Sequence, residues 1–453
     1  MQIKKKYIVL PIIFLALFSG EISGQATKIK SSEAYDILVD SDDQYVSALH
    51  SIKKNKGEIL YNVPEIHLIQ ADLSSKGYKD IVHNVTSSDN IMKSNDTEKT
   101  KVTNNNIKIS EDKFPFWAVQ WDMKKITNNG EDYKFIIPND HVTVGLVDSG
   151  VDVNHPSLKS SILKNGSENL VPKGGRNQSD TTETGNPNDI SDKLGHGTEV
   201  AGQITSDLNV RGSFPGVKMH VYRALGTTTS NPYWIMKGII ASADQNDAVI
   251  NVSLGKYLLS NKDQNNSIEY KSWKKAISYA YRKGSIIVAS SGEDGLNEDD
   301  QNSILKHYMK LQNLQKASGT VYDTPAQLKN VVSVGSTGPD DTVSDFSNYG
   351  NKIEFYAPGG DTSLYAKYGP QKWNELDLND SQLVATTAID GGYTYAYGTS
   401  FSAPKVTGAI ASFIAKYQWY DKPHQVTKYI QKVTHRNKQG LRIINENFLQ
   451  KKP

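Results

Sequence analysis

The stretch Val144-Gly-Leu-Val-Asp148-Ser-Gly150 is an apolar run that ends in an aspartate followed by a turn. A continuous apolar run of this kind predicts a buried strand of a parallel sheet, with Asp148 at its carboxyl end. Open α/β sheets hold their ligands in the crevice outside the carboxyl ends of such strands. The stretch therefore predicts an α/β fold with a functional carboxylate at the edge of its central sheet.

Two further motifs follow in the order Gly-His196-Gly-Thr and Gly-Thr-Ser400-Phe-Ser-Ala-Pro. Each predicts a helix that carries its polar residue near the N-terminus. At the start of the Ser400 helix, unsatisfied backbone N–H groups suit an oxyanion. In a catalytic triad the aspartate orients the imidazole, the imidazole accepts the hydroxyl proton, and the serine oxygen forms the acyl intermediate. Each motif alone is a weak indication, but together they predict Asp148, His196 and Ser400 as catalytic residues.

The order Asp, His, Ser is the one found in subtilisin, and across residues 114–420 the chain resembles the subtilisin family of serine proteases. The resemblance implies a three-layer α/β fold with a central, mainly parallel sheet. It also implies a serine endopeptidase whose acyl-transfer chemistry requires no cofactor. Calcium often stabilises this family, so structural calcium is possible, but no segment has a ligand spacing that names metal-binding residues.

The resemblance also carries over residues of the substrate cleft. The segment Ser253-Leu254-Gly255 is expected to line the cleft and to offer backbone groups to an extended peptide. Gly292 and Asp294 match the wall and base of the pocket for the residue before the scissile bond. A carboxylate at that base would favour Arg or Lys in the substrate. The alternative for Asp294 is an ordinary solvated surface loop.

The pattern breaks at Glu293, which stands where the family has an asparagine that binds the oxyanion. An ionised carboxylate would repel the developing charge, and loss of one such donor costs about 10²–10³ in rate. Glu293 could be protonated because burial raises its pKa, and could then donate a hydrogen bond. Alternatively it swings away and leaves the backbone N–H of Ser400 to act alone, or the chain is catalytically impaired. We expect an enzyme that is slower than its relatives.

The N-terminal part of the chain divides into segments of different composition. Residues 1–24 combine a basic start, a short apolar run and small residues, which is typical of a secretory signal peptide. Residues 25–88 predict a small α/β unit that resembles the family's propeptide, a folding chaperone and temporary inhibitor; an N-terminal binding domain is the alternative. Residues 89–112 are polar and aperiodic and predict a cleavable linker. The peptidase domain is then expected over residues 113–453.

Composition narrows the choice of function. The chain has 453 residues, a net charge of +2 and no cysteine, so neither nucleic-acid binding nor disulfides have support. No later segment is apolar for long enough to anchor the chain in a membrane, and we expect a secreted, extracellular monomer.

Among subtilisin-like enzymes the chain is most similar to the lantibiotic leader peptidases, which remove leader peptides from modified antimicrobial peptides. The similarity rests on the secretory signal, the long polar linker, the segment Phe114-Pro-Phe-Trp-Ala-Val-Gln-Trp121 and the region Gly292-Glu-Asp-Gly-Leu-Asn297. A broad-specificity extracellular subtilisin is one alternative. A catalytically impaired subtilisin fold that serves as a binding protein is the other.

Overall fold

The computed structural model describes residues 32–94, 107–109, 115–137, 139–176, 178–260, 268–434 and 436–451. The predicted signal peptide lies outside the described residues, as does most of the predicted linker.

A seven-stranded sheet forms the centre of the larger part of the chain, and every neighbouring pair of its strands is parallel. Helices or long loops connect its strands along the chain, because a parallel pair needs a crossover connection and cannot be joined by a tight turn. From edge to edge the order is β13 (Phe355–Pro358), β12 (Val331–Thr337), β10 (Ile286–Ser290), β8 (Val249–Val252), β5 (Thr143–Asp148), β7 (Lys218–Arg223) and β6 (Ile162–Asn169).

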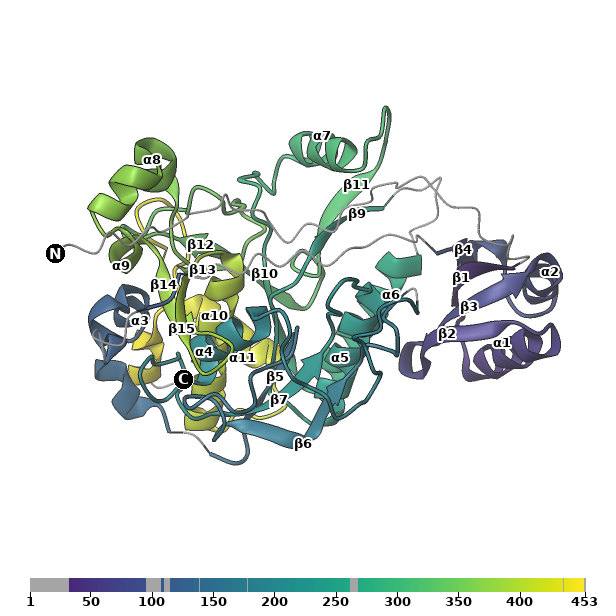
Figure 1. Ribbon diagram of the computed structural model, residues 1–453, viewed down its shortest axis with the longest axis horizontal. Coiled ribbons are helices and arrows are strands. Elements are labelled where there is room, and N and C mark those ends of the chain that lie inside the picture. Colours follow the sequence, from purple (N-terminus) through teal and green to yellow (C-terminus); the bar gives the residue numbers. More distant parts are fainter. Residues whose placement is uncertain are drawn as a thin grey trace.

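Helices cover both faces of this sheet, because successive side chains of each strand point to opposite sides (Figure 1). In β5, Val144 and Leu146 belong to the core beneath α4 (His196–Thr205) and α10 (Thr399–Tyr417). Val147 belongs instead to the core beneath α5 (Pro232–Asp244) and α6 (Ile268–Arg282). The structure thus confirms the predicted three-layer α/β fold.

Shorter elements surround the three layers. In Figure 1 the antiparallel pair of β9 and β11 projects from the body together with α7. A second antiparallel pair joins β14 to β15. The bounds are β9 (Lys256–Ser260), α7 (Gln301–Leu311), β11 (Thr320–Thr324), α8 (Ser363–Glu375), α9 (Asn379–Gln382), β14 (Val384–Thr387), β15 (Tyr393–Ala396), α3 (Trp121–Ile126), α11 (Pro423–Val433) and the 3₁₀ turns η4 (Phe116–Val119), η5 (Glu131–Phe135) and η6 (Glu446–Gln450).

The N-terminal residues form a separate small unit with a four-stranded sheet in the order β2-β3-β1-β4. Ser74 caps the second helix by accepting a hydrogen bond from the Gly77 N–H at 3.2 Å. The unit comprises β1 (Ser32–Leu38), α1 (Asp42–Lys54), β2 (Glu58–Val63), η1 (Pro64–Ile66), β3 (Leu68–Ser74), α2 (Ser75–Asn84), η2 (Ser88–Asn90) and β4 (Ile91–Lys93).

The predicted boundary of this unit at residue 88 is too early. β4 pairs antiparallel with β1, and Ile91 faces Ile37 and is buried in the unit's core. A three-residue strand is too short to show periodicity in a polar stretch, which is why the sequence assigned these residues to the linker. The unit therefore extends through β4, and the segment that remains for a linker begins after it.

The N-terminal unit lies beside α5 and α6, at the right of Figure 1. Leu38, Ile66 and Leu68 of the unit share an apolar cluster with Trp234 of α5. Polar contacts cross the same interface: the Tyr233 hydroxyl donates to Asp36 Oδ2 at 2.8 Å, Lys237 Nζ to Glu65 Oε1 at 2.5 Å, and Lys275 Nζ to the Val39 carbonyl at 2.9 Å.

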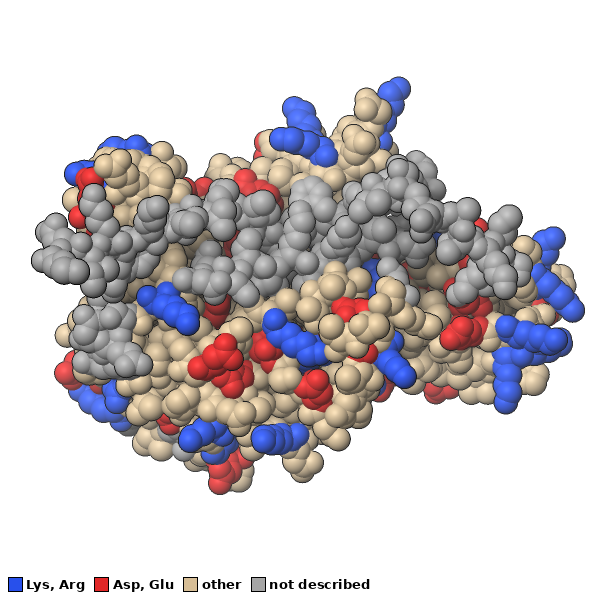
Figure 2. Space-filling model, in the orientation of Figure 1, with Lys and Arg blue, Asp and Glu red and all other residues tan. Residues whose placement is uncertain are grey.

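Basic and acidic side chains are intermixed on the face of the described residues that Figure 2 shows. That face carries no broad patch of either sign, as the small net charge leads one to expect. Within the described part of the chain, no helix is both long and apolar enough to span a bilayer.

Candidate active site

Asp148 is the last residue of β5 and is fully buried at the carboxyl edge of the sheet. Its Oδ1 atom accepts hydrogen bonds from the Ser149 N–H at 2.7 Å and from His196 Nδ1 at 2.7 Å. An Nδ1–H bonded to a carboxylate leaves Nε2 as the basic nitrogen of the neutral ring. The pair therefore has the arrangement that a general base requires.

His196 is the first residue of α4, and small residues bring its helix against the Asp148 strand. A Cβ atom at Gly197 would lie 2.1 Å from the Gly150 carbonyl oxygen, so only glycine permits this approach. Burial alone lowers the pKa of His196, but the charge and hydrogen bond of Asp148, aided by Glu199, outweigh burial and raise the pKa to about 9. The imidazolium form is thus strongly stabilised.

Ser400 is the second residue of α10, beside the N-terminus of that helix. Its Oγ donates to the Ser253 carbonyl at 3.3 Å, and its own carbonyl accepts from Ser253 Oγ at 2.9 Å. That carbonyl is available because Pro404, four residues on, has no N–H to bond it. The centroid of the His196 ring lies 5.9 Å from the ring centroid of Phe401, the residue after Ser400, so the imidazole packs against the start of α10.

Ser253, Leu254 and Gly255 follow β8 and are nearly all buried beside this serine. Asn251 Nδ2 donates to Ser253 Oγ at 3.0 Å, while Thr407 of α10 donates to Asn251 Oδ1 at 2.9 Å. The predicted cleft segment is thus bonded to the helix that carries Ser400.

Glu293 lies against the N-terminus of α10. Its Oε1 accepts from the Thr399 N–H at 2.6 Å and from the Thr399 hydroxyl at 2.9 Å, and the carboxylate also accepts from the Ser400 N–H. Burial raises the pKa of Glu293, while the Thr399 and Ser400 donors oppose the rise. The hypothesis that this side chain swings away is wrong for this structure, because the positive end of the helix attracts the carboxyl group.

Asp294 is not part of a solvated loop, so that alternative is wrong: its side chain is only 16% exposed. Its Oδ2 accepts from the Tyr257 hydroxyl at 2.9 Å, and its Oδ1 lies 3.2 Å from His307 Nε2. The sequence did not indicate either partner. Tyr257 belongs to β9 and His307 to α7, in a segment that carries no motif.

Two more carboxyl groups lie close to Asp294. Glu298 is fully buried and Asp323 is 3% exposed, and Asp323 Oδ2 accepts from the Gly292 N–H at 2.7 Å. Burial raises the pKa of Glu298 to about 7 and raises that of Asp323 well above its usual range. The wall that contains Gly292 and Asp294 is therefore rich in acidic groups.

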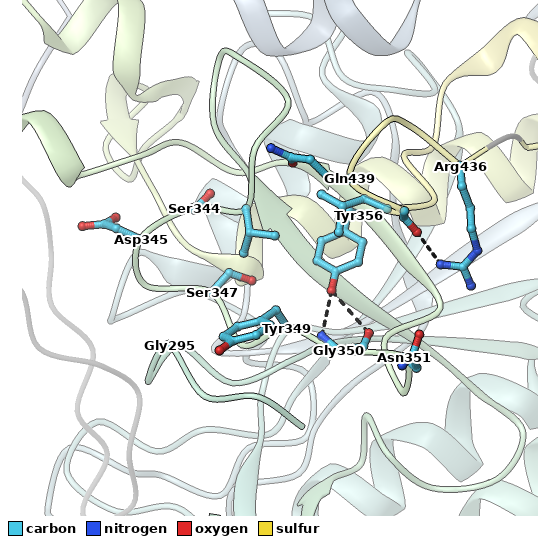
Figure 3. Close-up of a pocket in the computed structure, with 13 residues that line it drawn as sticks. Gly295, Ser344, Asp345, Ser347, Tyr349, Gly350, Asn351, Tyr356, Arg436 and Gln439 are labelled. Atoms are coloured by element: carbon cyan, nitrogen blue, oxygen red, sulfur yellow. Dashed lines mark hydrogen bonds between the residues drawn. The ribbon is translucent and has the colours of Figure 1, made fainter. Parts of the chain in front are cut away.

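A separate cavity of about 960 Å³ borders Gly295, the residue that follows Asp294 (Figure 3). Gly295, residues 343–351 and residues 436–441 supply most of its lining, and neither His196 nor Ser400 borders it. The Gly295 N–H donates to the Phe346 carbonyl at 2.9 Å, which joins the cavity's lining to the loop that bears Asp294.

Among the described residues, no group of three or more His, Cys, Asp or Glu side chains could hold a metal ion. The possible calcium site therefore stays an expectation without named ligands.

A parallel α/β sheet with a buried His–Asp pair and a serine at a helix N-terminus defines a serine hydrolase. The chain belongs to the subtilase family, whose model matches residues 139–447. It is accordingly a subtilisin-like serine endopeptidase.

Two relatives illustrate the similarity. The epidermin leader peptide-processing serine protease of Staphylococcus epidermidis is 38% identical over 445 residues, covering 94% of this chain and 93% of the relative. The nisin leader peptide-processing serine protease of Lactococcus lactis is 42% identical over 319 residues, which are 70% of this chain but only 46% of the relative.

Solved structures of the same kind of protein superpose on the chain. The Staphylococcus aureus epidermin leader peptide processing serine protease, crystallised as a serine-to-alanine mutant, gives a TM-score of 0.82 at 30% identity and covers 93% of this chain and 100% of that chain. The nisin leader peptidase of Lactococcus lactis gives 0.71 at 40% identity, covering 74% of this chain and 94% of that chain.

Proposed function

We propose that Asp148, His196 and Ser400 are the catalytic triad of an enzyme that removes leader peptides from lantibiotic precursors. The hydrogen bond of 2.7 Å between His196 Nδ1 and Asp148 Oδ1, beside Ser400, carries the assignment of the triad. The relatives named for epidermin and nisin leader processing support the substrate class. A broad-specificity extracellular subtilisin is the alternative function.

Catalysis begins when the Ser400 hydroxyl turns from the Ser253 carbonyl to His196 Nε2. His196 takes the proton as Ser400 Oγ attacks the scissile carbonyl, and Asp148 stabilises the resulting imidazolium. His196 then gives this proton to the leaving amine, and water hydrolyses the acyl-enzyme by the same route. The backbone N–H of Ser400 lies at the helix N-terminus, where it stabilises the oxyanion.

Glu293 weakens this oxyanion site in its ionised form, because its carboxylate already accepts the Ser400 N–H. The protonated form releases that N–H and presents an O–H donor of its own. The raised pKa of Glu293 favours this form. We therefore propose that protonated Glu293 binds the oxyanion and that the enzyme is slower than relatives with a neutral amide at this position.

The acidic wall supports a preference for Arg or Lys before the cut. Asp294 supplies a carboxylate, and Glu298 adds negative charge above its pKa of about 7, whereas the raised pKa of Asp323 favours the neutral acid. The substitution Asp294→Asn is expected to weaken cleavage after Arg while sparing cleavage after Leu, measured as kcat/KM on paired peptides. Unchanged discrimination between the two peptides would reject this role.

We further propose that residues 25–94 are a propeptide preceded by a secretory signal over residues 1–24, and that the released enzyme acts outside the cell. Support comes from the contacts of the N-terminal unit with α5 and α6, including Tyr233 with Asp36. The Staphylococcus epidermidis relative matches 94% of this chain, which includes most of the N-terminal unit. No cofactor is needed for the proposed chemistry.

The test is to express wild type and Ser400→Ala and to follow maturation by intact mass. Maturation of the wild type alone supports the triad, and the cleaved bond reports the preferred sequence. The matured enzyme is then given a lantibiotic precursor beside an unmodified casein substrate. Cleavage confined to the leader junction supports leader processing, whereas general digestion of both favours the broad-specificity alternative. Failure of the wild type to mature or to react with a fluorophosphonate would favour a binding protein instead.

A further inference from the structure

Asp192 lies four residues before His196 and accepts five hydrogen bonds around the start of α4. Such a density of donors on one half-buried carboxylate is more than a helix cap requires. Oδ1 accepts from Ser149 Oγ at 2.9 Å, the Leu194 N–H at 2.9 Å and the Gly195 N–H at 2.8 Å; Oδ2 accepts from the Thr198 N–H at 2.8 Å and Oγ1 at 2.7 Å.

Ser149 connects this carboxylate to the Asp148 strand. Its hydroxyl donates to Asp192 and accepts from the Gly197 N–H at 2.8 Å. Between them, Asp192 and Ser149 therefore hold the backbone N–H groups of residues 194, 195, 197 and 198, on both sides of His196. Ser149 is also the residue that follows Asp148, so one short network fixes both halves of the His–Asp pair.

We propose that Asp192 is a positioning residue that holds His196 in register against Asp148. This inference rests on the proposed catalytic role of His196. Asp148 fixes the ring of His196 by one hydrogen bond, but that bond holds its geometry only while the two backbones keep their spacing. Asp192 and Ser149 supply that spacing without touching the substrate.

The charge of Asp192 has a second, measurable effect on His196. Four carboxyl groups from different elements interact electrostatically with the imidazole. They are Asp148 of β5, Glu199 of α4, Glu293 of the segment before α7 and Asp192 of the loop before α4. Each of these groups stabilises the imidazolium when ionised. Removal of one negative charge lowers the pKa of His196, so the acid limb of the activity profile moves to lower pH.

The experiment compares Asp192→Asn with Asp189→Asn in the full-length chain. Asp189 is a matched control, because it accepts bonds from the Ser191 N–H and hydroxyl in the same loop but does not contact the His–Asp pair. Each variant is matured, with a trace of wild type where needed, and its first-order reaction with a fluorophosphonate is measured across pH. This readout does not depend on the identity of the natural substrate.

For Asp192→Asn we expect the labelling rate to fall by about 10- to 100-fold, as when a catalytic group is displaced by up to an ångström. We also expect the acid limb of the pH–rate profile to move to lower pH. Asp189→Asn should match the wild type. Ser149→Ala should slow labelling yet leave the acid limb in place, because the Asp192 charge remains. If Asp192→Asn does not fold, an unchanged labelling rate in Ser149→Ala would overturn the positioning network.

Equal labelling of Asp192→Asn and wild type would overturn the positioning role. So would a slower rate in Asp192→Asn with an unmoved acid limb, since that result would indicate general destabilisation. A wild type that fails to label at all would instead refute the proposed triad.

Discussion

Replacement of Glu293 by glutamine tests how the oxyanion site works. The amide has the same shape, so its Oε1 can keep the bonds from the Thr399 N–H and hydroxyl, which are 2.6 and 2.9 Å long in the wild type. Its Nε2 then donates to the oxyanion at every pH. Since one such donor contributes about 10²–10³ in rate, we expect kcat to rise by about 10²-fold on the alkaline side.

The pH profile should change in two ways. In the mechanism proposed above, the productive form of the wild type pairs a protonated Glu293 with a neutral His196, although the pKa of His196 is raised to about 9. Activity is therefore lost as pH rises through the pKa of Glu293 and also as pH falls through the pKa of His196. The pH–rate profile is bell-shaped as a result. Glutamine does not titrate, so the alkaline limb disappears. Loss of the nearby negative charge also lowers the pKa of His196 and moves the acid limb to lower pH.

The assay is kcat and KM on a peptide that spans the autoprocessing site, measured over pH for wild type, Glu293→Gln and a control. Glu354→Gln is the control, because burial also raises the pKa of Glu354, which accepts from Gln431 Nε2 at 2.5 Å outside the triad's contacts. The reasoning would be refuted if Glu293→Gln were slower than the wild type, or if it kept the same bell-shaped pH–rate profile.

Three further predictions concern stability and maturation. Arg223 holds the pKa of the buried Glu183 at about 2, although burial opposes this shift. The lowered pKa stabilises the fold by about 3 kcal/mol above pH 4.5, and this stabilisation is lost as pH falls toward 2. In urea denaturation, Glu183→Gln should lower the free energy of unfolding above pH 4.5 and remove this part of its pH dependence. Burial raises the pKa of Asp36, so the docked state favours the protonated carboxyl group. Docking of the N-terminal unit should therefore weaken as pH rises and Asp36 ionises. In a pull-down of the cleaved complex, Asp36→Asn should abolish this pH dependence. Lys405→Met leaves Asp122 buried without its ion pair and should cost about 3–5 kcal/mol in the same denaturation assay.

The sequence places Asp148 at a strand end and His196 and Ser400 near helix starts, and the structure has them there, because these features are set locally. A strand end, two helix starts and the glycines that permit close approach, such as Gly197 against Gly150, all lie within a few residues of Asp148, His196 and Ser400. The layers follow from the continuous apolar runs of the strands, which predict a parallel sheet covered on both faces. These features need no knowledge of distant contacts.

Features that depend on distant segments could not be predicted in this way. Glu293 contacts Thr399 across 106 residues, and the partners of Asp294 come from β9 and α7. β4 acquires its place only by pairing with β1, more than 50 residues earlier in the chain. Asp192 had a local indication, since an aspartate just before a helix is a common cap, but its bond to Ser149 appears only in three dimensions.

The position of β4 has a consequence for how the enzyme is switched on. A cut after Ser94 leaves all four strands and both helices of the small unit in one piece, with Ser94 Oγ still 2.5 Å from Asp36 Oδ1. Such a cut would turn the covalent tether into a one-to-one complex that can keep the contacts of the unit with α5 and α6. Under the proposed propeptide role, activation then depends on dissociation of the cleaved unit, so we expect the enzyme to be inhibited at high concentration and to gain activity on dilution.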